Sequence, residues 1–299
     1  MKAYLWMLCG TFTFATMGAL SHSFALGRAD WRLVTFARAA LMLLFAVPFA
    51  LATGTRLTLR GSPTLWMRSL SGSLGLLGMF YTLTHLHISE SITLLNLTPI
   101  WVAVLSWIFL KQRPGLKVVA AIAVSLVGVL LIARPHFDHA RAALIVGALS
   151  SVCTAVAVLS LNRLGHVETN TIVVHFAAVG TAVTAVVFAV SGQDLTRATP
   201  TGTADLLKLL GVGVTGTIGQ IALTRAFALG EASRVAIVGL TQLLFAVGYD
   251  RLLWHREYTP GTLLGMALVA APTAWLLTRS GATPESSGAP GAGAPAASS

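Results

Sequence analysis

Charged residues are scarce in this sequence. Only 10% of its 299 residues are Asp, Glu, Lys or Arg, whereas soluble domains carry about 25%. Hydrophobic residues make up 55% of the chain, and a soluble protein of this length needs a largely polar surface. The composition therefore excludes a soluble enzyme, a disordered regulator and a collagen-like fibre. It favours lipid as the environment of the apolar residues.

Cysteine is scarce as well. The chain has two cysteines, Cys9 and Cys153, and both lie inside apolar runs. A disulfide framework or a zinc site needs more numerous or more closely spaced ligands. We therefore expect neither a disulfide nor a metal site, and we interpret both cysteines as packing residues.

Acidic residues are fewer than basic ones. The chain has 20 Lys and Arg but only 10 Asp and Glu, which gives a net charge of +10. A soluble chain this basic would suggest nucleic acid as a partner. Here the basic residues are dispersed between apolar runs, where short basic loops orient membrane proteins. We therefore expect a lipid bilayer as the partner and no nucleic acid. The basic residues counted as loop residues include Arg56, Arg60, Arg68, Lys111, Arg113 and Lys117.

Ten apolar segments have about the 20 residues that a helix needs to cross a bilayer. They cover residues 4–26, 31–53, 64–86, 91–110, 116–133, 142–161, 170–191, 205–229, 232–254 and 261–278. The sequence thus predicts an all-α integral membrane protein with ten transmembrane helices. A cleaved signal peptide is the alternative for the first segment, but its apolar stretch exceeds the roughly 7–15 residues of such peptides. Residues 280–299 are rich in Gly, Ala, Pro and Ser and predict a disordered cytoplasmic tail.

The two halves of the chain repeat the same features in the same order. The matching pairs are residues 97–104 with 240–247, Gly75-x-x-Gly78 with Gly216-x-x-Gly219, residues 83–85 with 223–225, and Pro114-Gly115 with Pro260-Gly261. Each repeat holds five expected helices, and because five is odd the second repeat must start on the opposite side of the membrane. Such inverted repeats are typical of secondary transporters. We expect one repeat in residues 1–134 and the other in residues 141–279.

Residues 97–112 and 240–257 each have a Leu-Thr opening and an aromatic-rich run, followed by Pro-Gly. In this pattern the sequence resembles the EamA repeat of the drug/metabolite transporter superfamily. Arg38 lies where that family often has an arginine, and Arg163-Leu164-Gly165 with Glu168 resembles another recurring element. Lys111-Gln112-Arg113 departs from the Gly-Glu-Arg that is common in the family. The resemblance covers residues 1–279 and implies a central cavity lined largely by the third, fourth, eighth and ninth helices.

Polar side chains at mid-membrane depth are candidates for solute binding, because burying them in lipid is costly. Asn96 and Gln242 lie near the middle of the fourth and ninth segments, at nearly equivalent repeat positions. The alternative is that each bonds to a neighbouring helix and only stabilises the bundle. Trp101 is a further candidate that could equally face lipid. The remaining binding candidates are Tyr81, Gln220 and Thr224.

Three ionisable residues are candidates for gating or coupling. Arg38 lies about 10 Å inside the second segment, at 1.5 Å per residue. Asp250 lies at a similar depth in the ninth, so an ion pair would offset the burial cost of both. That pair would act as a gate or as a static brace, and Arg251 competes for Asp250. His175 lies near the repeat-equivalent position of Arg38 and is either a titrating group or a hydrogen-bonded structural residue.

A carboxylate near the middle of a span is absent from all ten expected segments. Proton-coupled carriers commonly use such a group as a relay. Exchange driven by the solute gradient therefore carries the same weight as coupling through His175 or Asp250.

Together these features predict a secondary transporter that moves a small metabolite by alternating access, as an exporter or an exchanger. The expected solute is an amino acid, a cofactor or a drug-like compound, and no cofactor is needed. We expect a monomer or homodimer in the bacterial inner membrane with both termini cytoplasmic. One alternative is a membrane enzyme acting on lipid-linked substrates, although the sequence lacks the cluster of acids, His or Lys that it would need. The other is a non-transporting membrane scaffold.

Overall fold

The computed structural model describes residues 1–25, 31–55, 57–58, 61–86, 88–133, 141–190, 202–255 and 257–279, and all their regular secondary structure is helical. The predicted tail, residues 280–299, lies outside the described residues. The helices are α1 (Lys2–Ala25), α2 (Trp31–Ala52), α3 (Pro63–His85), α4 (Ile88–Leu95), α5 (Thr98–Leu110), α6 (Leu116–Ala133), α7 (Arg141–Arg163), α8 (Thr169–Val190), α9 (Thr203–Leu229), α10 (Ala232–Gly239), α11 (Thr241–Trp254) and α12 (Pro260–Arg279).

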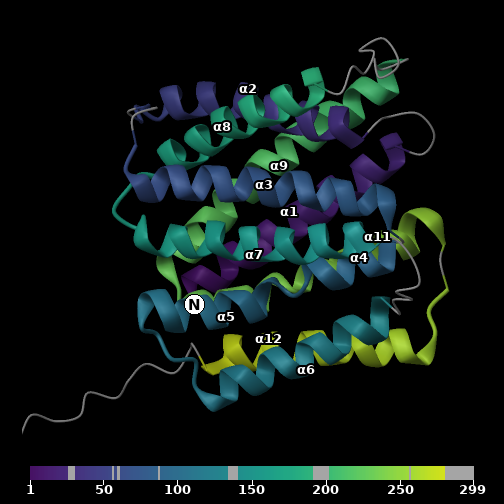
Figure 1. Cartoon of the computed structure of the whole chain (residues 1–299). Coiled ribbons are helices and arrows are strands. Elements are labelled where there is room, and N and C mark those ends of the chain that lie inside the picture. Colours follow the sequence, from purple (N-terminus) through teal and green to yellow (C-terminus); the bar gives the residue numbers. More distant parts are fainter. Residues whose placement is uncertain are drawn as a thin grey trace, which may run out of the picture.

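The long helices lie side by side in one bundle, with their axes along a common direction (Figure 1). The beginning of α1 and the end of α12 lie at the same end of this bundle (Figure 1). Large apolar side chains cover its outside, and Leu44, Ile108 and Val186 are 61%, 60% and 62% exposed. An exterior of this kind suits a hydrocarbon environment, where helices satisfy their own backbone hydrogen bonds.

Within the described residues, eight helical segments are long and apolar enough to cross a membrane. They are Lys2–Ser21, Val34–Ala52, Thr93–Leu110, Leu116–Ala133, Arg141–Arg163, Thr169–Val190, Thr203–Leu229 and Ala232–Leu253. The third and tenth predicted segments, α3 and α12, are not in this group. The 23 residues of α3 include Arg68 and six Ser or Thr, which lower its hydropathy. The apolar part of α12 is shorter, at Pro260–Leu276.

Two predicted segments, 91–110 and 232–254, are each broken into two helices. The breaks lie at Leu97 and Leu240, which have nearly the same backbone conformation, with φ −71° and ψ −14° against φ −65° and ψ −17°. In the first segment, Pro99 in the opening turn of α5 explains the break, because proline has no N–H to continue the helix. The second segment breaks without a proline.

Threonine hydroxyls compensate for both breaks. The hydroxyl of Thr98 donates to the carbonyl oxygen of Leu95, and the hydroxyl of Thr241 donates to that of Val238, in each case three residues earlier. Both oxygen–oxygen distances are 2.7 Å. These bonds satisfy carbonyl groups that would otherwise lack a partner where no water is available. The repeated Leu-Thr pair found in the sequence therefore marks the same structural feature in both halves.

The two halves also agree in how their helices end and pack. Lys111 and His255, with φ of 55° and 51°, are the two non-glycine residues with positive φ in the described chain, and they end α5 and α11. Helix α1 packs along α9 as α3 packs along α7, and α2 packs on α8 while α6 packs on α12. The first helix of each half thus packs on the third helix of the other half, and the second helices pack on each other, as do the last helices.

Small residues and hydroxyls hold the helices together. A Cβ atom on Gly128 of α6 would lie 2.6 Å from the carbonyl oxygen of Gly265 on α12, and the reverse distance is the same. The Oγ1 atoms of Thr11 and Thr241 lie 3.0 Å apart, which links α1 to α11. Close packing of small residues and interhelical hydrogen bonds are the main attractions between helices in lipid, where the hydrophobic effect gives little.

The glycine contact between α6 and α12 gives the first prediction. We expect Gly128→Ala to destabilise the protein by about 1–3 kcal/mol, because the new methyl group overpacks against the backbone of α12. Gly18→Ala is the matched control, since nothing lies within 4 Å of a Cβ there and alanine favours a helix more than glycine. Thermal unfolding of the detergent-purified variants measures both effects. Equal midpoints for the two variants would contradict the packing proposed for α6 and α12.

Candidate functional site

A cavity of about 370 Å³ lies among the helices, next to both helix breaks. Asn96 and Pro99 line it at the first break, and Leu240 and Gln242 line it at the second. Helices α1, α2, α7 and α8 also contribute to its wall, together with α3 and α9. The lining is therefore broader than the four helices that the family resemblance implied. Its volume is in the range of pockets that hold small molecules.

The wall of the cavity is mostly apolar and adaptable. Aromatic rings offer flat contact surfaces, and methionine side chains adjust to irregular shapes. Asp and Glu are absent from the described residues that line it. The aromatic and methionine residues of the wall are Phe14, Phe176, Phe227, Met7, Met17 and Met79.

Four of the candidates from the sequence lie together in this wall. Asn96 and Gln242 flank the two breaks, Gln220 comes from α9, and Arg38 comes from α2. Gln220 is 5% exposed, and its Nε2 atom has no hydrogen-bond partner among the described residues. Such a buried amide is available to a solute that enters the cavity. The solute-binding role of the three amide residues stays a prediction.

Arg68 also lines the cavity, whereas the sequence pattern predicts a position among the basic loop residues. That placement was wrong, because Arg68 lies inside α3 and is 3% exposed. Its guanidinium carbon lies 4.4 Å from the ring centroid of Phe176 on α8. The available signal was its position within the predicted third segment, since a charge inside a span is a functional candidate by default.

Two candidates lie in helix packing and are not part of the cavity lining. The hydroxyl of Thr224 is buried and donates to the carbonyl oxygen of Gln220 over 2.7 Å. His175 is fully buried, with its Nδ1 atom 2.7 Å from the hydroxyl oxygen of Ser69. The edge of the Trp66 ring packs against the imidazole, with the centroids 4.9 Å apart. These contacts fit the structural interpretation of His175, and a solute-binding role for Thr224 stays a prediction.

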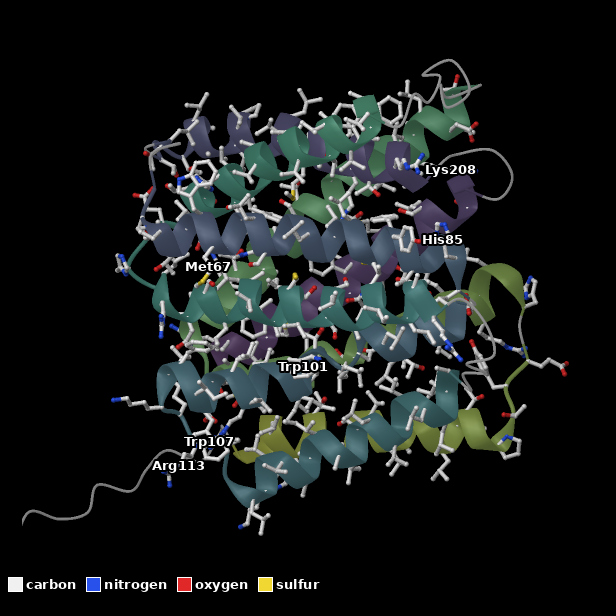
Figure 2. All side chains as sticks on the ribbon, in the orientation of Figure 1. Met67, His85, Trp101, Trp107, Arg113 and Lys208 are labelled. Atoms are coloured by element: carbon white, nitrogen blue, oxygen red, sulfur yellow. The ribbon has the colours of Figure 1, made fainter. Side chains whose placement is uncertain are left out.

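Tyr81 and Trp101 also lie outside the lining. Tyr81 stacks on His85 with ring centroids 4.0 Å apart, towards the end of α3 opposite to Met67 (Figure 2). Trp101 is partly buried and packs against a buried cluster that includes Ala155 and Val158 of α7.

Asp250 lies on α11 outside the cavity lining, whereas Arg38 is part of it. The guanidinium carbon of Arg38 lies 6.0 Å from the ring centroid of Phe14. An ion pair between Arg38 and Asp250 stays a prediction, as does a gating role for either residue.

Comparison with known proteins places this geometry in context. Residues 1–134 match the sequence model of the EamA-like transporter family. This chain superimposes on a solved crystal structure with a TM-score of 0.81. The match covers 94% of this chain and 99% of the other. Its sequence identity is 16%, so this likeness concerns the fold alone.

Curated relatives are named as transporters. The pseudopaline exporter CntI of Pseudomonas aeruginosa is 29% identical over 263 residues, which cover 87% of this chain and 90% of that protein. Solute carrier family 35 member G1 of Homo sapiens is 22% identical over 219 residues, which cover 69% of this chain and 59% of that protein. These names point to a transporter and not to an enzyme.

The cavity wall gives the second prediction, which compares two leucines of α3. Leu76 lines the cavity, whereas Leu74 is 54% exposed on the outside of the bundle. In a chain carrying Cys9→Ala and Cys153→Ala, we expect Leu76→Cys to react with a charged methanethiosulfonate at least about tenfold faster than Leu74→Cys. The reason is that a thiolate forms in a hydrated cavity and not in lipid. Mass spectrometry of the labelled protein gives both rates, and equal rates would show that the cavity is not hydrated.

Proposed function

We propose that this protein, whose residues 1–134 match the EamA-like transporter family, is a secondary transporter of the drug/metabolite transporter superfamily that moves a small metabolite by alternating access. The observation that carries the proposal is the cavity at the two helix breaks, which both halves of the chain line with amide side chains. A bound solute would accept or donate hydrogen bonds at Asn96, Gln220 and Gln242. Its apolar part would contact the aromatic and methionine wall.

We further propose ten transmembrane spans, formed by two inverted repeats at residues 1–134 and 141–279. In this arrangement α4 and α5 together cross the membrane once, and α10 and α11 do the same. The equivalent breaks at Leu97 and Leu240 support it, and so do the equivalent helix ends at Lys111 and His255. The packing of α1 on α9 and of α3 on α7 is the pairing that an axis in the membrane plane would produce.

The distribution of basic residues supports cytoplasmic termini in a bacterial inner membrane. Arg113 lies at the end of the bundle where α1 begins, and Lys208 lies towards the opposite end (Figure 2). Lys111 and Lys117 flank Arg113 in the sequence and add to the positive charge of that end. Positively charged short loops remain on the cytoplasmic side.

Alternating access needs two structures of similar free energy that open the cavity to opposite sides. Inverted repeats provide them, because each half can adopt the conformation of the other. The breaks at Leu97 and Leu240 are positions where a half-helix can tilt without losing a long row of backbone bonds. We propose export or exchange as the direction, in line with the name of the Pseudomonas aeruginosa relative.

Counterflow into proteoliposomes tests the function. Vesicles that contain the purified protein are loaded with a bacterial metabolite extract and placed in the same extract labelled with ¹³C. We expect saturable entry of one class of labelled solute, identified by mass spectrometry and absent from protein-free vesicles. A lack of saturable flux for all metabolite classes would contradict the proposal.

The amides at the breaks give the third prediction. We expect Gln242→Leu to lower the rate of counterflow at subsaturating solute by about 3- to 10-fold, which corresponds to the loss of one net hydrogen bond. Gln112→Leu is the matched control, because Gln112 is exposed outside the helices. Unchanged counterflow in Gln242→Leu, with the elution profile of the wild type, would remove Gln242 from the binding site.

A further inference from the structure

Two arginines and no acidic side chain line the cavity within the described residues. From this excess of positive charge we propose that the transported solute is an organic anion, and that Arg68 binds its carboxylate or phosphate group. The inference rests on the proposed transport function, and it names the chemical class of the solute.

Arg68 is a buried cation with an unused hydrogen-bond donor, as expected of a residue that binds an anionic ligand. It is 3% exposed, and its Nε atom is buried without a hydrogen-bond partner among the described residues. Arg68 forms no ion pair with a described side chain, and the pairs Lys208–Asp205 and Arg234–Glu231 lie away from the cavity. A buried charge without a counter-charge is costly, so it is retained where a ligand or water compensates it.

The surroundings of Arg68 fix its position. The ring of Phe176 lies against the guanidinium at 4.4 Å, a favourable cation–π contact. Gly72, one turn later on α3, leaves the space that the guanidinium occupies. A Cβ atom at residue 72 would lie only 2.4 Å from Nη1 of Arg68. The chain therefore holds this planar group in place by shape, and not by an ion pair.

Arg38 adds a second positive charge from the opposite end of the bundle. Helices α2 and α3 are consecutive and antiparallel (Figure 1). Arg38 lies about 10 Å from the start of α2, and Arg68 lies about 7.5 Å from the start of α3, at 1.5 Å per residue. Both nevertheless line the same cavity. Two like charges in an apolar enclosure attract an anion and repel a cation.

The guanidinium group indicates which anions fit. Its N–H donors form a fork that matches the two oxygens of a carboxylate or the oxygens of a phosphate. The rings of Phe14 and Phe227, with the nearby methionines, suit an apolar or aromatic remainder of the solute. We therefore expect a small organic acid or phosphate ester with an apolar part. The experiment below distinguishes a carboxylate from a phosphate as the bound group.

The test measures binding by the purified full chain in detergent, at constant ionic strength. The probes share one phenyl group and differ in charge: phenylacetate, its neutral amide phenylacetamide, the cation phenethylamine, and phenyl phosphate. Dose-dependent shifts of the thermal unfolding midpoint give apparent Kd values. We expect at least one anion to bind about tenfold or more tightly than phenylacetamide, and phenethylamine to bind least.

Substitution then assigns the preference to Arg68. We expect Arg68→Gln to reduce the anion-over-amide ratio to about twofold or less, and Arg68→Lys to keep part of it. Arg113→Gln removes the same charge from an exposed site, where the guanidinium lies 5.9 Å from the ring of Trp107, and should leave the ratio unchanged. Gly72→Ala keeps the charge but displaces the guanidinium, so it should lower the ratio even if Arg68→Gln fails to fold.

Each outcome has one meaning. Preference for phenylacetate identifies a carboxylate as the bound group, and preference for phenyl phosphate identifies a phosphate. Equal binding of anion, amide and amine overturns the inference, as does an equal loss of preference in Arg68→Gln and Arg113→Gln. Anion binding without counterflow of any solute would contradict the transport function and leave the site intact. Counterflow of neutral or cationic solutes would overturn the inference and leave the transport function intact.

Discussion

A backbone that crosses a bilayer must satisfy its own hydrogen bonds, because the hydrocarbon offers it no partner. The rest of this structure depends on that constraint. The helices at Leu97 and Leu240 break, yet the hydroxyls of Thr98 and Thr241 bond to the carbonyl oxygens left by the breaks. The N–H groups of Ile100 and Leu243 also bond to the carbonyl oxygens of the break residues, at 3.0 Å. Both breaks therefore keep these carbonyl groups bonded within the protein, and they bring polar side chains to the cavity.

The same constraint explains why small and hydroxyl-bearing residues are buried while large apolar residues face outwards. In lipid a leucine gains little from leaving the surface, but two backbones gain contact when glycine lets them approach, as Gly128 and Gly265 do. Short hydroxyl bonds, such as that from Ser150 to the carbonyl oxygen of Gly75, add directional links between α7 and α3. Tight packing elsewhere leaves the space at the breaks as a site for a solute.

The apolar helical segments are predictable from sequence, because hydropathy measures how unfavourable the exposure of each side chain to water is. The helix breaks are not, because hydropathy is the same on both sides of a kink, and only Pro99 carries a visible signal. Gln242 stands where the first half has Pro99, so the second break depends on packing and on Thr241. Arg68 was grouped with Arg56 and Arg60 as a loop charge. Its burial depends on Phe176, more than 100 residues away, and no local pattern reports that contact.

The positive charge of the cavity also constrains the proposed transport cycle. In alternating access the cavity must close on both sides for a moment, which removes water from Arg38 and Arg68. Closing an empty cavity would then bury Arg68 without a partner, whereas closing it around an anion would bury an ion pair. The loaded protein would therefore change sides more readily than the empty protein. A carrier with that asymmetry favours exchange of one anion for another over net movement, and it needs no carboxylate relay in the middle of a span.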